Sequence, residues 1–113
     1  MTATVRAFCH SGVTTAAVTG TMFATDSVSL VKQPYLARSS VTVDTGTAQS
    51  TTAAPAGTTL LLVQVEAGKA VHLEVNPPNR STAADTGSPI YSGTFHLACG
   101  VDWTISVLES TIV

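Results

Sequence analysis

The stretch Gly57–Pro78, GTTLLLVQVEAGKAVHLEVNPP, decides the fold class predicted for this chain. It contains two apolar runs, Thr59–Glu66 and Ala70–Val75, joined by a short Ala-Gly-Lys link. Both runs alternate with the period of two that is typical of β-strands. Pro77-Pro78 ends the second run, because proline cannot donate a hydrogen bond to a β-ladder. The stretch therefore predicts a central β-hairpin.

The first run of this stretch is apolar on both faces. Leu61, Val63 and Val65 share one face, which we assign to the hydrophobic core. The opposite face also needs cover, because burying one leucine stabilises a fold by roughly 1.5–3 kcal/mol. In the second run two polar residues alternate with the apolar ones, which predicts a half-exposed strand. The candidates for a subunit interface on these second faces are Leu60, Leu62, His72 and Glu74.

Other runs with strand character recur along the chain at a spacing of roughly ten residues. They are Val5–His10, Thr14–Phe23, Ser27–Lys32, Ser39–Asp44, Ala48–Thr52, Ile90–Ala98, which Gly93 interrupts, and Asp102–Leu108. The pattern predicts an all-β, antiparallel sandwich or barrel of about eight or nine short strands in one domain, residues 1–113. It predicts no helix longer than about two turns.

The composition supports this reading and excludes several partners. The chain has 19 Thr, 15 Ala and 14 Val, and the β-branched residues among them favour strands. Charged residues make up 11%, well below the usual quarter, and the net charge is −2. So little charge predicts no nucleic-acid or membrane partner, and the many small apolar side chains indicate a surface that another subunit covers. The few basic residues are scattered: Arg6, Lys32, Arg38, Lys69 and Arg80.

No targeting or membrane segment is expected. The first residues contain no apolar core of a signal peptide, and no apolar run reaches the roughly 18 residues of a membrane helix. The two cysteines, Cys9 and Cys99, fit a reducing compartment, although the sequence leaves open whether they pair.

A zinc site was weighed and is not predicted. Cys9-His10 and His96-x-x-Cys99 supply four ligands of the right type. Adjacent residues of a strand point to opposite faces, however, and so do residues three apart. The members of each pair should therefore diverge, and we expect no metal and no cofactor.

The triplet Asp-Thr-Gly occurs twice, at Asp44–Gly46 and Asp85–Gly87. In VTVDTGTAQS it follows an apolar strand, which resembles the catalytic loop of retroviral-type aspartic proteases. That resemblance implies a dimer in which Asp44 of each copy shares a proton with the other. The family has a helix near its C-terminal end, whereas VDWTISVLES alternates like a strand. We interpret both triplets as turns, since Asp and Gly favour turns, and keep the protease as the alternative.

No other catalytic motif is present in the sequence. It contains neither a G-x-S-x-G elbow nor a phosphate loop nor a dinucleotide fingerprint. We therefore predict no enzymatic activity and no catalytic residues.

The stretches VTVDTGTAQSTTAAPAGTTLLLVQV and SPIYSGTFHLACGVDWTISVL resemble the small, Thr/Ala/Val/Gly-rich and lysine-poor β proteins of tailed-phage particles. The resemblance implies a capsid decoration (cement) protein that stabilises the head shell, a homotrimer with a jelly-roll-like sandwich. It also implies the major capsid protein or another virion protein as partner, and the virion, assembled in the host cytoplasm, as location. Residues 1–13 are then a candidate extended arm on the capsid or a partner subunit. A tail or head-fibre β-sandwich binding module is the neighbouring possibility.

Overall fold

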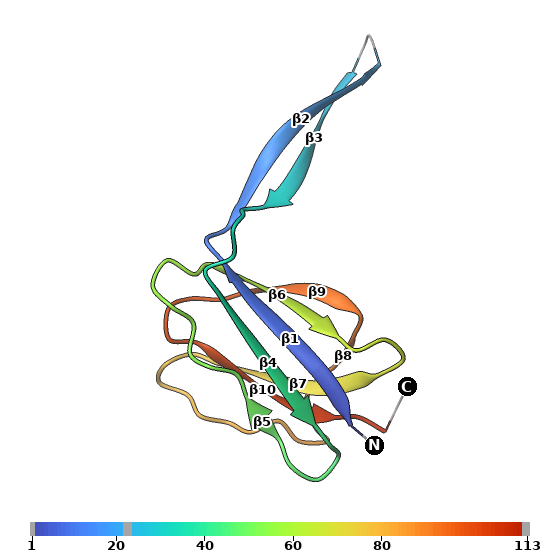
Figure 1. Ribbon diagram of the computed structural model, residues 1–113, viewed down its shortest axis with the longest axis vertical. Helices are drawn as coiled ribbons and strands as arrows, with labels where there is room; N and C mark the ends of the chain where they lie inside the picture. The colour runs from blue at the N-terminus through green and yellow to red at the C-terminus, as the bar shows by residue number, and fades with distance from the viewer. Residues whose placement is uncertain (1, 22–23, 112–113) are drawn as a thin grey trace.

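The chain folds into a sandwich of two four-stranded antiparallel sheets, from which a two-stranded hairpin projects (Figure 1). This computed structural model describes residues 2–21 and 24–111, and it describes side chains outside residues 15–29. All the secondary structure in these ranges is β, which confirms the predicted fold class. Accordingly, the described residues include no helix that could cross a membrane.

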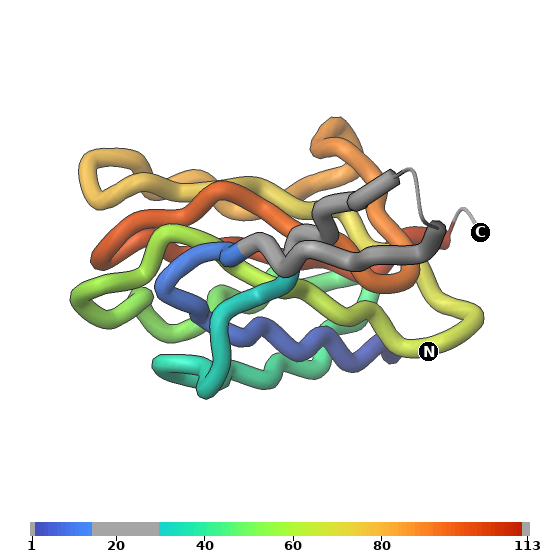
Figure 2. Tube along the Cα trace, turned by 90° about the horizontal axis from the view of Figure 1, so that it is seen from above, coloured from blue at the N-terminus to red at the C-terminus, as the bar shows by residue number. Residues whose placement is uncertain are grey.

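The two sheets form the two layers that are visible in Figure 2. Sheet I has the order β4-β1-β6-β9, with β1 at Ala3–His10, β4 at Ala37–Val43, β6 at Leu60–Val65 and β9 at Thr94–Ala98. Sheet II has the order β5-β10-β7-β8, with β5 at Gln49–Ser50, β7 at Ala70–Asn76, β8 at Ile90–Ser92 and β10 at Thr104–Glu109. The projecting hairpin, here called the arm, consists of β2 at Val13–Thr21 and β3 at Ala24–Val31.

The strand order is that of a jelly roll. From β4 to β10 the chain visits the sheets in the succession I, II, I, II, II, I, II, and β1 fills the remaining place in sheet I. Residues near both ends of the chain therefore lie beside the end of β4. Ala3 pairs with Val43, and the N–H of Glu109 donates to the carbonyl of Asp44. The arm lies in the connection between β1 and β4, at the opposite end of β1 from the N-terminus (Figure 1).

The core lies between the sheets and consists of small and medium apolar side chains. As assigned from the sequence, Leu61, Val63 and Val65 point into it and are at most 7% exposed. The other buried members are Ala3, Val5, Ala7, Cys9, Val43, Ala54, Val71, Leu73, Ile105 and Val107. Their alternation with outward-facing neighbours is the reason why these segments form strands rather than helices.

The central stretch is not a hairpin, so that prediction is wrong. Its first strand, β6, pairs with β1 and β9 in sheet I, whereas β7 pairs with β10 and β8 in sheet II. The tight link between them passes from one layer to the other, with Gly68 at a φ of 77° and a hydrogen bond from Lys69 N to Glu66 O of 3.1 Å. An arch of this kind places the apolar residues of both strands on the facing inner surfaces of the two sheets.

The predicted strand Ile90–Ala98 also changes layers. Gly93, at a φ of 71°, separates β8 in sheet II from β9 in sheet I. A left-handed conformation of this kind favours glycine. The break that the sequence suggested is therefore a corner of the sandwich.

The N-terminal segment, residues 1–13, is not an extended arm, which corrects that prediction for its described residues. Ala3–His10 is a central strand of sheet I, paired with β4 on one side and β6 on the other. Its alanines carry little hydrophobic signal in the sequence, yet Ala3 and Ala7 are at most 1% exposed. The projecting element is instead β2 with β3. Phe23, where the second run was predicted to end, lies outside the described residues.

Candidate functional site

The outer face of sheet I carries apolar side chains that remain in contact with solvent. Cross-strand pairing forms one row across the four strands: Arg38, Phe8, Leu62 and His96. Phe8 and Leu62 are half-buried at the centre of the row, and its two ends are exposed. Leu60, in the neighbouring row, is half-buried as well.

The segment that returns from the arm to β4 extends this apolar surface. The ring of Tyr35 packs edge-on against Phe8 with 5.3 Å between the centroids, and Tyr35 is still 47% exposed. Leu36 beside it is 45% exposed, and its N–H donates to Cys9 O at 2.6 Å. The outer patch, as we use the term, consists of Phe8, Tyr35, Leu60 and Leu62.

The placement expected for two interface candidates is confirmed. Leu60 and Leu62 lie on the outer face of sheet I, opposite to Leu61 and Val63 in the core. Their contact with another subunit stays a prediction.

The root of the arm is tied to sheet I by a buried histidine. Nδ1 of His10 lies 2.8 Å from the carbonyl oxygen of Lys32, where β3 has just ended, and His10 is 1% exposed. Lys32 N donates to Gly12 O at 2.9 Å, and the Thr59 hydroxyl donates to Ser11 O at 2.8 Å. The bonds of His10 and Thr59 tie the two ends of the arm to the sandwich, and the bond between Lys32 and Gly12 joins these ends to each other.

The outer face of sheet II is covered by the chain itself. The loop from Pro77 to Pro89 folds back over β7, where Nδ1 of His72 lies 3.0 Å from Ser88 O. The Ser88 hydroxyl donates to Oε1 of Glu74 at 3.0 Å, and Arg80 donates to Oε2 of the same carboxylate at 2.8 Å. This loop therefore occupies the position that a partner would need.

The expected half-exposure of β7 is wrong at His72, which is only 4% exposed. Glu74 is partly buried and holds its own loop through Arg80. Alternation in the sequence predicted which side chains of β7 point away from the core, but it did not predict that the following loop covers them. As interface candidates both residues remain untested.

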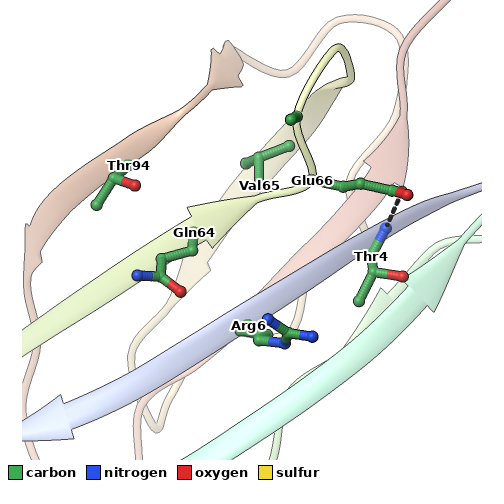
Figure 3. A pocket seen from close by; sticks show the side chains of 7 residues that line it. Thr4, Arg6, Gln64, Val65, Glu66 and Thr94 are labelled. Atoms are coloured by element: carbon green, nitrogen blue, oxygen red, sulfur yellow. Dashed lines mark hydrogen bonds between the residues drawn. The ribbon is translucent and has the colours of Figure 1, made fainter.

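A hollow of ≈ 430 Å³ lies on the same outer face of sheet I, beside the turn after β6 (Figure 3). Its lining is mostly polar: Thr4, Arg6, Gln64, Val65, Glu66, Ala67 and Thr94. One oxygen of Glu66 accepts a hydrogen bond from Thr4 N at 3.1 Å. The hollow contains two threonine hydroxyls and one carboxylate, and no serine, cysteine or histidine. We regard it as the polar rim of the outer patch.

The alternative catalytic residue, Asp44, is engaged in a turn. Its Oδ1 accepts hydrogen bonds from the N–H groups of Gly46 and Thr47, both at 2.8 Å. These bonds stabilise the carboxylate and lower its pKa below the ordinary value of 3.8. Asp85 forms the same kind of turn with Gly87 N at 2.8 Å. Both triplets thus have the turn geometry expected, and the helix associated with the protease is replaced by β10.

We expect Asp44→Asn to melt close to wild type and only slightly lower at neutral pH, because an asparagine Oδ1 still accepts both bonds but carries no charge. Asp44→Ala should melt lower. Because the pKa of Asp44 is lower in the folded than in the unfolded protein, the ionised carboxylate stabilises the fold at pH values above the unfolded-state pKa. This stabilisation is lost as the pH falls through the folded-state pKa. The deficit of Asp44→Ala should therefore shrink in acid, as thermal melts from pH 7 to pH 2 would show. Peptide cleavage at acid pH that Asp44→Asn abolishes would instead establish the protease.

The four residues weighed as zinc ligands do not converge. Cys9 faces the core, whereas His96 is exposed on the outer face of sheet I. Over residues 2–21 and 24–111, no group of three or more His, Cys, Asp or Glu side chains could hold a metal ion. Both cysteines are free thiols, and burial raises the pKa of each above its ordinary value.

The two thiols should differ in reactivity. Cys9 is 6% exposed and Cys99 is half-buried, and a raised pKa leaves little reactive thiolate in either at neutral pH. We expect a thiol reagent to label Cys99 slowly in the native protein, and Cys9 only after denaturation. Mass spectrometry of the peptides after timed labelling measures this order, and native labelling of Cys9 first would contradict the burial described.

Sequence reasoning missed Phe8, Tyr35 and Arg38 as members of the exposed face. The signal for Phe8 was its position between the inward-facing Ala7 and Cys9, which sends it outward once β1 is recognised as a sheet strand. Tyr35 gave no periodic signal because it lies in a connection.

Comparison with protein-family models, with curated proteins and with solved structures gave no match to this chain.

Proposed function

We propose that this chain is a structural protein of a virion: a capsid decoration subunit that assembles as a homotrimer and stabilises the head shell. The observation that carries the proposal is the difference between the two outer faces. The chain's own loop covers sheet II over His72, whereas the outer patch of sheet I remains open. An apolar face beside a projecting arm suits a protein whose task is to pack against other subunits.

The composition and the chemistry of the described residues support the same assignment. Only 11% of the residues are charged, which suits repeated packing among subunits. The carboxylate of Asp44 is engaged in a turn, and the polar hollow contains no serine, cysteine or histidine. The major capsid protein is the proposed partner, and the virion is the proposed location.

Rebinding to stripped particles tests this function. Particles of the virus that encodes the chain would be freed of it by mild denaturant and mixed with the purified protein. We expect the protein to sediment with the shells in a sucrose gradient and to saturate at a fixed number of copies per head. Protein that stays at the top of the gradient while the shells sediment would contradict the assignment.

A matched pair of variants sharpens the experiment. Leu62→Asp alters the outer patch, whereas Gln64→Asp introduces the same charge two residues further along the same face, in the polar hollow. Gln64→Asp should bind shells like wild type, and Leu62→Asp should not. Equal binding by both would mean that binding to shells does not depend on the outer patch.

A further inference from the structure

The arm projects without pairing to either sheet in the described part of the chain. Its ladder runs from the Val13–Val31 pair to the Thr21–Ala24 pair, and in the described part no strand of either sheet pairs with β2 or β3. Figure 1 shows it leading away from the sandwich, beyond the end of β1. A two-stranded ribbon in water is marginally stable at best. The arm therefore needs a surface to lie on, and its own sandwich does not supply one.

The base of the arm is apolar and exposed on both sides. Val13 is 53% exposed and Leu30 is 47% exposed. Val13 pairs with Val31 and Leu30 pairs with Thr14, so Val13 and Leu30 stand on opposite faces of the ribbon. From Val13 to Val31 the sequence contains a single charged residue, Asp26. A surface that receives the arm should thus be largely apolar, with positive charge near it.

The outer face of sheet I has these properties. The outer patch occupies its centre, and Arg6 and Arg38 are exposed on the same face with no ion pair among the described residues. The dimensions also agree: at about 3.3 Å per residue, the arm strands span about 30 Å and β1 about 26 Å. One arm can therefore lie along the whole length of this face.

We propose that the arm of each copy docks on the outer face of sheet I of a second copy, with Leu30 against the outer patch. This inference rests on the proposed homo-oligomer and names its contact. The arm and the face are different surfaces, so the contact is heterologous; such a contact closes into a ring when the rotation between copies permits it and otherwise builds an open filament. In a ring of three copies, each arm docks on the outer face of sheet I of the next copy.

Two variants that each lose one side of the contact test this arrangement. Leu30→Asp disrupts the contact surface of the arm and leaves the outer face of sheet I intact. Leu62→Asp disrupts the outer face of sheet I and leaves the arm intact. Each change places a charge in an apolar contact, and we expect association of each variant alone to weaken by about 100-fold or more. Circular dichroism and thermal melting would verify that both stay folded, and Val13→Asp, on the opposite face of the arm, is the matched control that should still associate.

Mixing the two variants gives the decisive result. The intact arm of the Leu62→Asp copy can dock on the intact face of the Leu30→Asp copy, but the ring cannot close. Native mass spectrometry of an equimolar mixture, with one variant labelled with ¹⁵N, should show a dimer containing one copy of each. A mixture that stays monomeric, or a Leu30→Asp protein that forms trimers by itself, would overturn the proposal.

Photo-crosslinking gives a reading that does not depend on the strength of a single contact. A photoreactive residue at position 30 of otherwise wild-type protein should crosslink to peptides containing Phe8 or Leu62, and between ¹⁴N and ¹⁵N copies. Crosslinks confined to one copy, or to another arm, would reject arm-to-face docking. A trimer that binds shells would still support the proposed function in that case, whereas a monomeric wild type would remove both proposals.

Discussion

Val63→Asp should unfold this protein. Val63 is 0% exposed in the middle of β6, where it pairs with Ala7 on one side and Phe95 on the other. The surrounding core is apolar, and no cation lies among its members to pair with a carboxylate. An unpaired charge in such a place costs several kcal/mol, against a total stability of about 5–15 kcal/mol for a domain. We expect a loss of more than about 4 kcal/mol.

Far-UV circular dichroism and thermal melting measure this loss. The control is Gln64→Asp, the next residue in the same strand, which faces the polar hollow and should melt close to wild type. A Val63→Asp protein with a cooperative melt near that of wild type would mean that β6 does not have the orientation described.

Leu62→Asp should give a folded protein that no longer associates. Leu62 belongs to the same strand but points to the other side, between Phe8 and His96 on the outer face of sheet I. It is half-buried in the isolated chain, so water can hydrate the new carboxylate when no partner is present. In an assembly the same carboxylate would be buried without a counter-charge, and association should weaken by about 100-fold or more.

Light scattering and thermal melting together separate the possible results for Leu62→Asp. A monomer that is folded and melts cooperatively is the expected result. A chain that unfolds outright would mean that both faces of β6 belong to one core. A variant that keeps the full wild-type mass would place the interface elsewhere, and the open patch would then have another purpose.

The sequence was sufficient to predict the faces of the strands. Leu61, Val63 and Val65 alternate with Leu60 and Leu62, and the period of two assigns them to opposite sides whatever their neighbours are. It was not sufficient to predict which strands pair. A hairpin and an arch between two sheets have the same periodicity, and the choice depends on partners far away in the chain, such as β1 for β6.

Sequence patterns also could not predict which outer faces of the two sheets are covered by other parts of the chain. The loop over His72 is held by bonds of Ser88 and Arg80 that no local pattern predicts. In the same way, the two runs that form the arm looked like ordinary strands. Their separation from the sandwich depends on the absence of pairing with either sheet in the described residues, which is a property of the whole fold.

We propose that the outer face of sheet I, with Phe8 and Leu62 at its centre, is the contact between copies of this chain. The molar mass of the purified wild-type protein, measured by light scattering over a range of concentrations, tests it most directly. The chain has a mass of 11.6 kDa, and the account predicts a species of three times that mass. A mass of one chain at every concentration would contradict it.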